Sequence, residues 1–163
     1  MHLVGADGKE LVAGWIPVSS FGMDFSAETS YGKGSGASVG KASASEVTLG
    51  LGISAAITKL LSNEVRGTSI ATVEVEAYAP HGGVNGKPAL VDEYFFNTAF
   101  VTGVDSNSSA ENALSFGYRS FSHSHLAYNQ LGKLDAASSS SVGYSIIESK
   151  LIGVPSPQPD VFG

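Results

Sequence analysis

Two histidines stand one residue apart in the second half of the chain, at His123 and His125. If this segment is a strand, alternate side chains point to the same side of it, so the two imidazoles could share one cation. Exposed strand histidines without a ligand are the commoner alternative. Glu74 and Glu76 have the same spacing, and paired carboxylates can act as acid and base. Because such alternation usually marks the solvated side of a strand, we expect these glutamates to face water.

The histidine pair is the nearest approach to a metal-binding motif. Gly117 precedes His123 with five residues between them, and this resembles the first half of the cupin motif, Gly-x5-His-x-His. The cupin motif then needs a carboxylate four or five residues on. Those positions hold Asn129 and Gln130, which are poor substitutes for an anionic ligand, and the second cupin motif is missing. We therefore predict no catalytic, cofactor-binding or metal-binding residues.

The composition limits the function classes. Apolar residues make up 42% of the 163 positions and charged residues only 15%, where about 25% is usual, so part of the surface is expected to be covered by another molecule. A net charge of −6 argues against nucleic-acid binding, which needs a basic face. The absence of cysteine excludes disulfides and thiolate metal sites. No leader pattern and no membrane-length apolar run is visible, so we expect no membrane insertion.

Period-two alternation predicts a mostly β domain. The clearest case is residues 46–53, where four aliphatic residues alternate with polar or small ones. Further strands are expected at residues 15–25, 69–78, 94–104, 113–129 and 143–153. Strands of this kind must hide their edges, either by closing a barrel or by pairing with another chain.

One helix is expected at about residues 55–66. Ser54 can cap its start, and Gly67 stands where a helix-ending glycine belongs. Its apolar stripe consists of Ile57, Leu60 and Leu61.

Two segments lack a periodic pattern. Residues 27–45 are rich in glycine, serine and lysine, and 19 residues are long for a loop in a compact domain. We expect a functional arm there, with a flexible surface loop as the alternative. The proline-rich tail, residues 154–163, is expected to be loosely held.

Several short motifs follow one another in a fixed order. Residues 15–22 (WIPVSSFG) resemble a W-I-x-V-x-S-F-x-x-G opening, and a long Gly/Ser/Lys arm follows at 27–45. A strand then leads directly into a helix at 48–60 (TLGLGISAAITKL), and GYSIIESK at 143–150 resembles a closing G-W-D-x-x-x-N-K. Over about residues 10–152 the chain thus resembles the haemolysin-coregulated protein (Hcp) family, the tube proteins of bacterial type VI secretion.

The chain departs from the family pattern at both ends. Asp7-Gly8 lies only seven residues before Trp15, so the first strand is expected to be shortened, absent or rearranged. Tyr144 and Ser145 replace the usual Trp-Asp pair. Both a main tube subunit and a divergent paralogue fit these departures.

The resemblance implies a fold and a mechanical function. The fold would be a compact β-barrel of two antiparallel sheets with one α-helix packed against it, in a single domain of residues 1–153. The function would be that of a structural tube subunit, forming homo-hexameric rings that stack through the 27–45 arm. Removing residues 29–43 should then spare the fold and weaken stacking.

The resemblance also implies partners and a location. Effector proteins would lie in the lumen of the tube, and spike and sheath proteins would be further partners. The protein would be cytoplasmic before export and then secreted without a signal peptide, and it would be neither an enzyme nor a cofactor-binding protein.

Two alternatives remain from the residues themselves. One is a cupin-like metal-dependent barrel enzyme using His123 and His125. The other is a monomeric β-barrel that binds a small ligand or carbohydrate, with Tyr31, Tyr118 and Tyr128 as candidate stacking residues.

Overall fold

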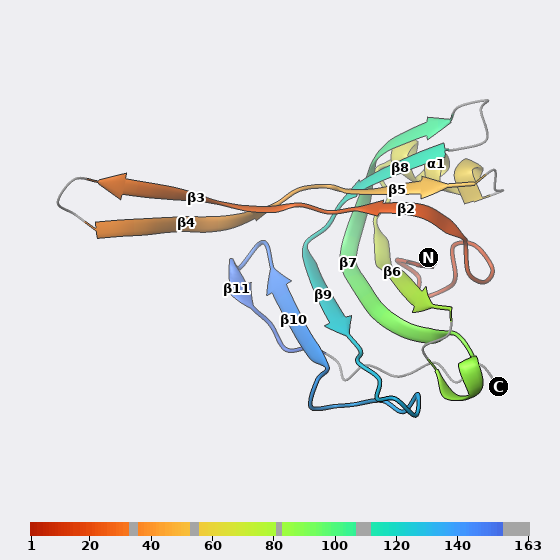
Figure 1. Cartoon of the computed structure of the whole chain (residues 1–163). Coiled ribbons are helices and arrows are strands. Elements are labelled where there is room, and N and C mark those ends of the chain that lie inside the picture. The colour runs from red at the N-terminus through yellow and green to blue at the C-terminus, as the bar shows by residue number, and fades with distance from the viewer. Residues whose placement is uncertain (33–35, 53–55, 81–82, 107–111, 155–163) are drawn as a thin grey trace.

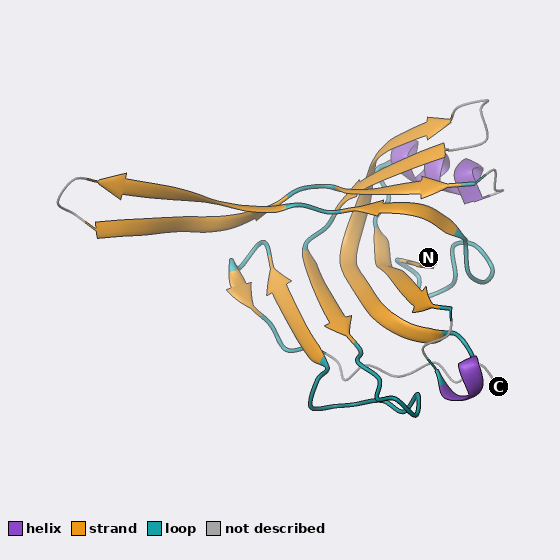
Figure 2. Ribbon diagram, viewed as in Figure 1, coloured by secondary structure: helices purple, strands orange, loops and turns teal. Residues whose placement is uncertain are grey.

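Strands dominate the chain, as the alternation predicted, and a single α-helix lies beside them (Figure 1, Figure 2). A computed structural model describes residues 1–32, 36–52, 56–80, 83–106 and 112–154, with only the backbone described in 28–41 and at 85 and 106. The helix is α1 (Ala56–Arg66), and η1 (Val84–Gly86) is a short 3-10 turn. The strands are β1 (His2–Gly5), β2 (Val18–Gly22), β3 (Phe25–Gly32), β4 (Gly36–Ala44), β5 (Val47–Leu51), β6 (Ile70–Ala79), β7 (Ala89–Ser106), β8 (Asn112–Gly117), β9 (Ser120–His125), β10 (Ser140–Ser145) and β11 (Lys150–Leu151).

The long strand β7 holds two sheets together. Its first half pairs with β6 along one edge and with β9 along the other, and its second half pairs with β8. Thr98 separates the halves and has a φ of 51°, a left-handed conformation that β-branched residues rarely adopt. The strand bends strongly along its length (Figure 1). The strand expected at residues 94–104 is confirmed and lies within the longer β7.

The two sheets are antiparallel throughout and remain open. One has the order β1-β6-β7-β9-β10-β11 and the other the order β7-β8-β5-β2. Within the described part of the chain, no pairing links β2 to β1, β6 or β11. The mostly β, two-sheet architecture with one helix is therefore confirmed, but the sheets curl around a core without closing the expected barrel.

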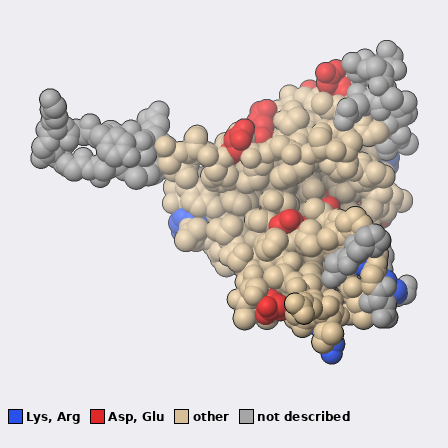
Figure 3. All heavy atoms as spheres, in the orientation of Figure 1, with Lys and Arg blue, Asp and Glu red and all other residues tan. Residues whose placement is uncertain are grey.

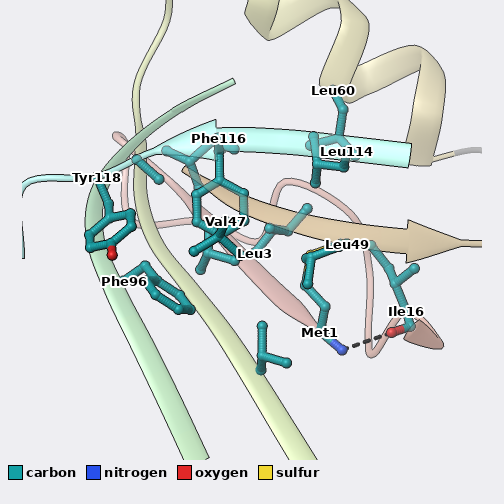
Figure 4. Close-up of a cluster of buried hydrophobic side chains, with 14 of the residues drawn as sticks. Met1, Leu3, Ile16, Val47, Leu49, Leu60, Phe96, Leu114, Phe116 and Tyr118 are labelled. Atoms are coloured by element: carbon teal, nitrogen blue, oxygen red, sulfur yellow. Dashed lines mark hydrogen bonds between the residues drawn. The ribbon is translucent and has the colours of Figure 1, made fainter. Parts of the chain in front are cut away.

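The core fills the concave space between the two sheets (Figure 4). Phe96, Phe116 and Tyr118 form edge-to-face aromatic pairs at its centre. The amine of Met1 donates a hydrogen bond to the carbonyl of Ile16 over 2.7 Å, at the edge of the same cluster (Figure 4). The shortened first strand thus contributes to the core rather than lying outside it.

The helix ends as predicted but buries a narrower stripe. Gly67 has a φ of 61°, and its N–H bonds the carbonyl of Glu64, which ends the helix. Leu60 is fully buried and points towards the sheet (Figure 4), whereas Leu61 is 45% exposed. The expected cap, Ser54, lies outside the described residues. No described helix has the length and apolar character needed to cross a membrane.

Residues 27–45 contribute to a projecting β-hairpin, although they show no alternating pattern. Strands β3 and β4 pair only with each other, in a separate two-stranded sheet. The ribbon continues β2 and β5 outward and leaves the body of the molecule (Figure 1). The backbone is thus a hairpin arm, and the alternative of an irregular loop does not describe it.

Three expected strands were too long. The 15–25 segment forms β2 and then breaks at Met23 and Asp24, where the hairpin begins. The 113–129 segment divides into β8 and β9 at Tyr118 and Arg119, because the two strands pair with different halves of β7. The 143–153 segment folds back on itself as β10 and β11.

The core contains one polar atom without a partner. Among the described side chains, the buried hydroxyl of Tyr118 neither donates nor accepts a hydrogen bond. Burial raises the pKa of Tyr118 to about 12. By contrast, the hydroxyl of Tyr128 donates to the carbonyl of Leu90 over 2.8 Å. The two tyrosines therefore offer a matched pair for mutation.

We expect Tyr118→Phe to leave the free energy of unfolding unchanged or to raise it by up to about 1 kcal/mol, because it removes an unsatisfied buried hydroxyl. Tyr128→Phe should lower it by about 1 kcal/mol, because it removes a formed hydrogen bond. Urea unfolding of both variants measures the difference. A larger loss in Tyr118→Phe than in Tyr128→Phe would contradict the prediction.

Candidate functional site

The two histidines singled out in the sequence share one carboxylate. The Nε2 atom of His123 lies 3.0 Å from Oδ1 of Asp92, and Nδ1 of His125 lies 2.9 Å from the same oxygen. They belong to β9, and Asp92 sits directly opposite His125 on β7. The imidazole of His123 also stacks on the ring of Tyr94, with centroids 4.2 Å apart. As the spacing predicted, both histidines lie on one side of their strand.

The charge of Asp92 is stabilised by its two histidines. Partial burial is the largest single influence and opposes ionisation of the carboxyl group. The hydrogen bonds from His123 and His125 and the electrostatic attraction of both rings together outweigh burial, so the pKa of Asp92 lies below its ordinary value of 3.8. The trio is therefore a satisfied polar cluster on the concave side of the sheet.

The structure gives the cupin-like alternative little support. Gly117 ends β8 while the histidines belong to β9, so the motif is not carried by one strand. The Oδ1 atom of Asn129 accepts hydrogen bonds from the backbone N–H groups of Leu131 and Lys133. These bonds stabilise the loop to which Asn129 belongs. The acidic residue beside the histidines is instead Asp92, far away in sequence. Only the register of β7 against β9 reveals it, and sequence spacing carries no signal for that register.

Glu74 and Glu76 do not simply face water. Together with the buried Glu93 they form an acidic group, in which one carboxylate oxygen of each residue lies within 4.8 Å of those of the other two. Among the described residues, no other three acidic or histidine side chains meet this criterion. Tyr78 donates a 2.7 Å hydrogen bond to Glu76, and Nδ1 of His2 lies 3.5 Å from Glu74.

The amine of Met1 lies near this acidic group. Burial lowers its pKa, while the charges of Glu76 and Glu74 oppose that change. Glu74 and Glu76 are half-buried, so the expectation that they face water holds only in part, and Glu93 beside them on β7 is buried.

The tyrosines proposed for ligand stacking do not form a shared platform. Tyr118 is a core residue, and Tyr128 is tied by its hydroxyl to the backbone of β7. The side chain of Tyr31 lies outside the described residues. A surface hollow of about 600 Å³ lies beside His125 and Tyr128, but its walls are mainly loop residues, several of them glycines. Of the two candidate tyrosines whose side chains are described, only Tyr128 lines this hollow.

The projecting hairpin is the most distinctive surface feature. Among the described strands, its two strands pair only with each other, and Phe25 at its base contacts Phe121 of the core. Charged side chains are sparse over the described surface on the face drawn in Figure 3. A two-stranded ribbon that extends away from the body gains little from the chain's own core beyond its base, which points to contact with another molecule.

Comparison with known proteins adds evidence of kinship. The sequence profile of a family described as "Type VI secretion system effector, Hcp" matches residues 3–125. No curated protein is similar enough in sequence to count as a relative.

Solved structures share the fold. One described as a type six secretion system protein is 22% identical, with 92% of this chain and 94% of that chain covered and a TM-score of 0.73. A mutant of the Hcp1 protein from E. coli EAEC 042 is 12% identical, with 82% and 93% covered and a TM-score of 0.65. The secreted protein Hcp3 from Pseudomonas aeruginosa is 15% identical, with 86% and 94% covered and a TM-score of 0.58.

The histidine–aspartate cluster predicts a specific pH dependence. The pKa of Asp92 is 3.8 in the unfolded chain and lower in the folded chain. The ionised carboxylate therefore stabilises the fold fully above pH 3.8, and this stabilisation is lost as the pH falls through the folded pKa. Asp92→Asn should therefore be less stable than the wild type at pH 7, by about 1 kcal/mol.

We expect this difference to shrink below pH 3.8 in urea unfolding curves. Asp105→Asn, at an exposed position on β7, is the control and should change stability little. A gap between Asp92→Asn and the wild type that stays constant down to pH 2 would refute the assignment.

Proposed function

The chain belongs to the Hcp family of type VI secretion proteins, and on that premise we propose that it is a structural tube subunit that assembles into hexameric rings. The observation that carries the proposal is the projecting hairpin β3–β4, whose strands pair only with each other among those described. A monomer would expose this ribbon to water beyond its base. A partner ring would give it a surface to contact.

Two apolar patches support a closed ring. One lies at the β10–β11 end, where Ile147 is 64% and Leu151 is 73% exposed. The other lies on helix α1, where Leu61 is 45% and Val65 is 81% exposed. The two elements lie on opposite sides of the body (Figure 1). A ring needs two different complementary surfaces on each subunit, and these patches are suitably separated for a head-to-tail contact.

The sparse charge fits the same assembly. Few charged side chains mark the described surface in Figure 3, and only 15% of all residues are charged. Ordinary soluble domains carry about 25%. A subunit that neighbours cover on several sides needs fewer charges to stay in solution.

We further propose that stacked rings form a secreted tube. The hairpin would contact the next ring, and effector proteins would lie in the lumen. Spike and sheath proteins would be the other partners. The protein would begin in the cytoplasm and leave the cell with the apparatus. The proposed role is mechanical and assigns no catalytic residue.

The first test is the mass in solution, measured by size exclusion with light scattering on metal-free protein. A hexamer would have a mass of about 100 kDa, six times the 16.7 kDa of one chain. Rings should also be visible by negative-stain microscopy. A stable 16.7 kDa monomer at high concentration would contradict the proposal.

A shortened hairpin tests the stacking role. Ala27 pairs with Ala42, so replacing residues 28–41 by Asn-Gly should close a tight two-residue turn at that pair. We expect an unchanged number of subunits per ring and a melting temperature within a few degrees of the wild type, because the replaced part of β3 and β4 pairs only with itself among the described strands.

Stacking of the shortened rings, followed by light scattering and electron microscopy, should be lost. In the control variant a Gly/Ser segment of equal length replaces residues 28–41. This variant separates the effect of segment length from the effect of the hairpin's own residues. Tubes that form equally well from the shortened chain would rule out the hairpin as the stacking element.

A further inference from the structure

The hairpin is joined to the body through a short break in one continuous ribbon. Strands β2 and β5 pair as far as Gly22 and Thr48, and strands β3 and β4 begin pairing at Phe25 and Ala44. Two residues on the outgoing strand face three on the returning strand, so the ladder shifts there by one residue. An extra residue on one strand bends a ribbon and increases its twist. The break is thus where the direction of the hairpin is set.

Ser45 bridges the break with its backbone and its side chain. Its N–H donates to the carbonyl of Asp24, and its hydroxyl accepts the N–H of Asp24, both over 2.9 Å. The same hydroxyl donates to the carbonyl of Glu46 over 2.9 Å. A side-chain oxygen therefore replaces the missing ladder carbonyl and connects both strands at the bend.

Phe25 joins the base of the hairpin to the other sheet. Its ring lies 4.9 Å from the ring of Phe121 and 6.0 Å, edge to face, from that of Tyr144, measured between centroids. Phe121 belongs to β9 and Tyr144 to β10, so one side chain connects the hairpin to two strands that it does not pair with. Phe25 is nevertheless 41% exposed, so its ring is not needed to fill the core. Aromatic pairs of this geometry add stability beyond that of the buried area alone.

We infer that Phe25 and Ser45 form a lock at the base of the hairpin that fixes its direction relative to the body. Beyond this base, β3 and β4 contact only each other among the described elements, so the lock is what restrains the ribbon as a whole. The inference rests on the proposed function in one respect: a hairpin held in the direction required by the next ring loses less conformational entropy on stacking. Both side chains are positioning residues and need not touch the partner.

The direction of the hairpin is measurable without any stacking assay. The chain has no cysteine, so Ser38→Cys on β4 and Lys59→Cys on α1 introduce two specific sites for spin labels. Labelled subunits are mixed with an excess of unlabelled ones, so that each unstacked ring carries at most one labelled subunit. With Phe25 and Ser45 unchanged, the distance between the two labels should then show one narrow distribution. Phe25→Ala should roughly double its width, because the ribbon gains freedom at its base.

Three further variants make the measurement decisive. Phe25→Tyr keeps the aromatic contact and should restore the narrow distribution. Phe100→Ala removes a phenylalanine of equal exposure, 40%, on β7, and should leave the distribution narrow. Ser45→Ala removes the hydroxyl bridge without changing an apolar contact, and it should broaden the distribution even if Phe25→Ala folds poorly.

The stacking assay then separates the lock from the proposed function. We expect Phe25→Ala rings to need a roughly tenfold higher concentration to stack, with an unchanged ring mass. A broadened distribution with unchanged stacking would support the lock but contradict the stacking role of the hairpin. An unchanged distribution in both Phe25→Ala and Ser45→Ala would overturn the lock, whatever happens to stacking.

Discussion

The pairing of β7 determines the arrangement of the other elements. Its 18 residues pair with β6 on one edge and must accommodate both β9 and β8 on the other. Strands β9 and β8 lie one after the other along that edge. The bend at Thr98, between the two pairings, divides the strands into two sheets that enclose the aromatic core. A left-handed conformation at a β-branched residue costs of order 1–3 kcal/mol, and it persists because pairing on both sides of the bend compensates for it.

Local patterns predicted the elements where burial alone decides the structure. Val47, Leu49 and Leu51 alternate because one side of β5 faces the core, and all three are fully buried. Gly67 ends the helix because only glycine adopts the left-handed conformation easily. In both cases the signal and its physical cause lie within a few consecutive residues, which is why the sequence was sufficient.

Roles that are set by distant partners were not predicted from local patterns. Phe21 and Phe25 are each more than a third exposed, and their rings contact Tyr94 and Phe121 on other strands. Asp92 completes the histidine cluster only through the β7–β9 register. The cluster that resembled a metal motif is internally satisfied, so the residues with the strongest chemical signal carry none of the proposed mechanical function.

The continuity of the ribbon across its break has a mechanical consequence. Because β3 and β4 extend β2 and β5, a pull on the tip of the hairpin is transmitted along both strands into the sheet that contains β8 and β7. Antiparallel hydrogen bonds run perpendicular to the strands, so such a force loads many of them together in shear instead of opening them one by one. The ribbon can therefore carry tension from its tip into the sheet formed by β5, β8 and β7.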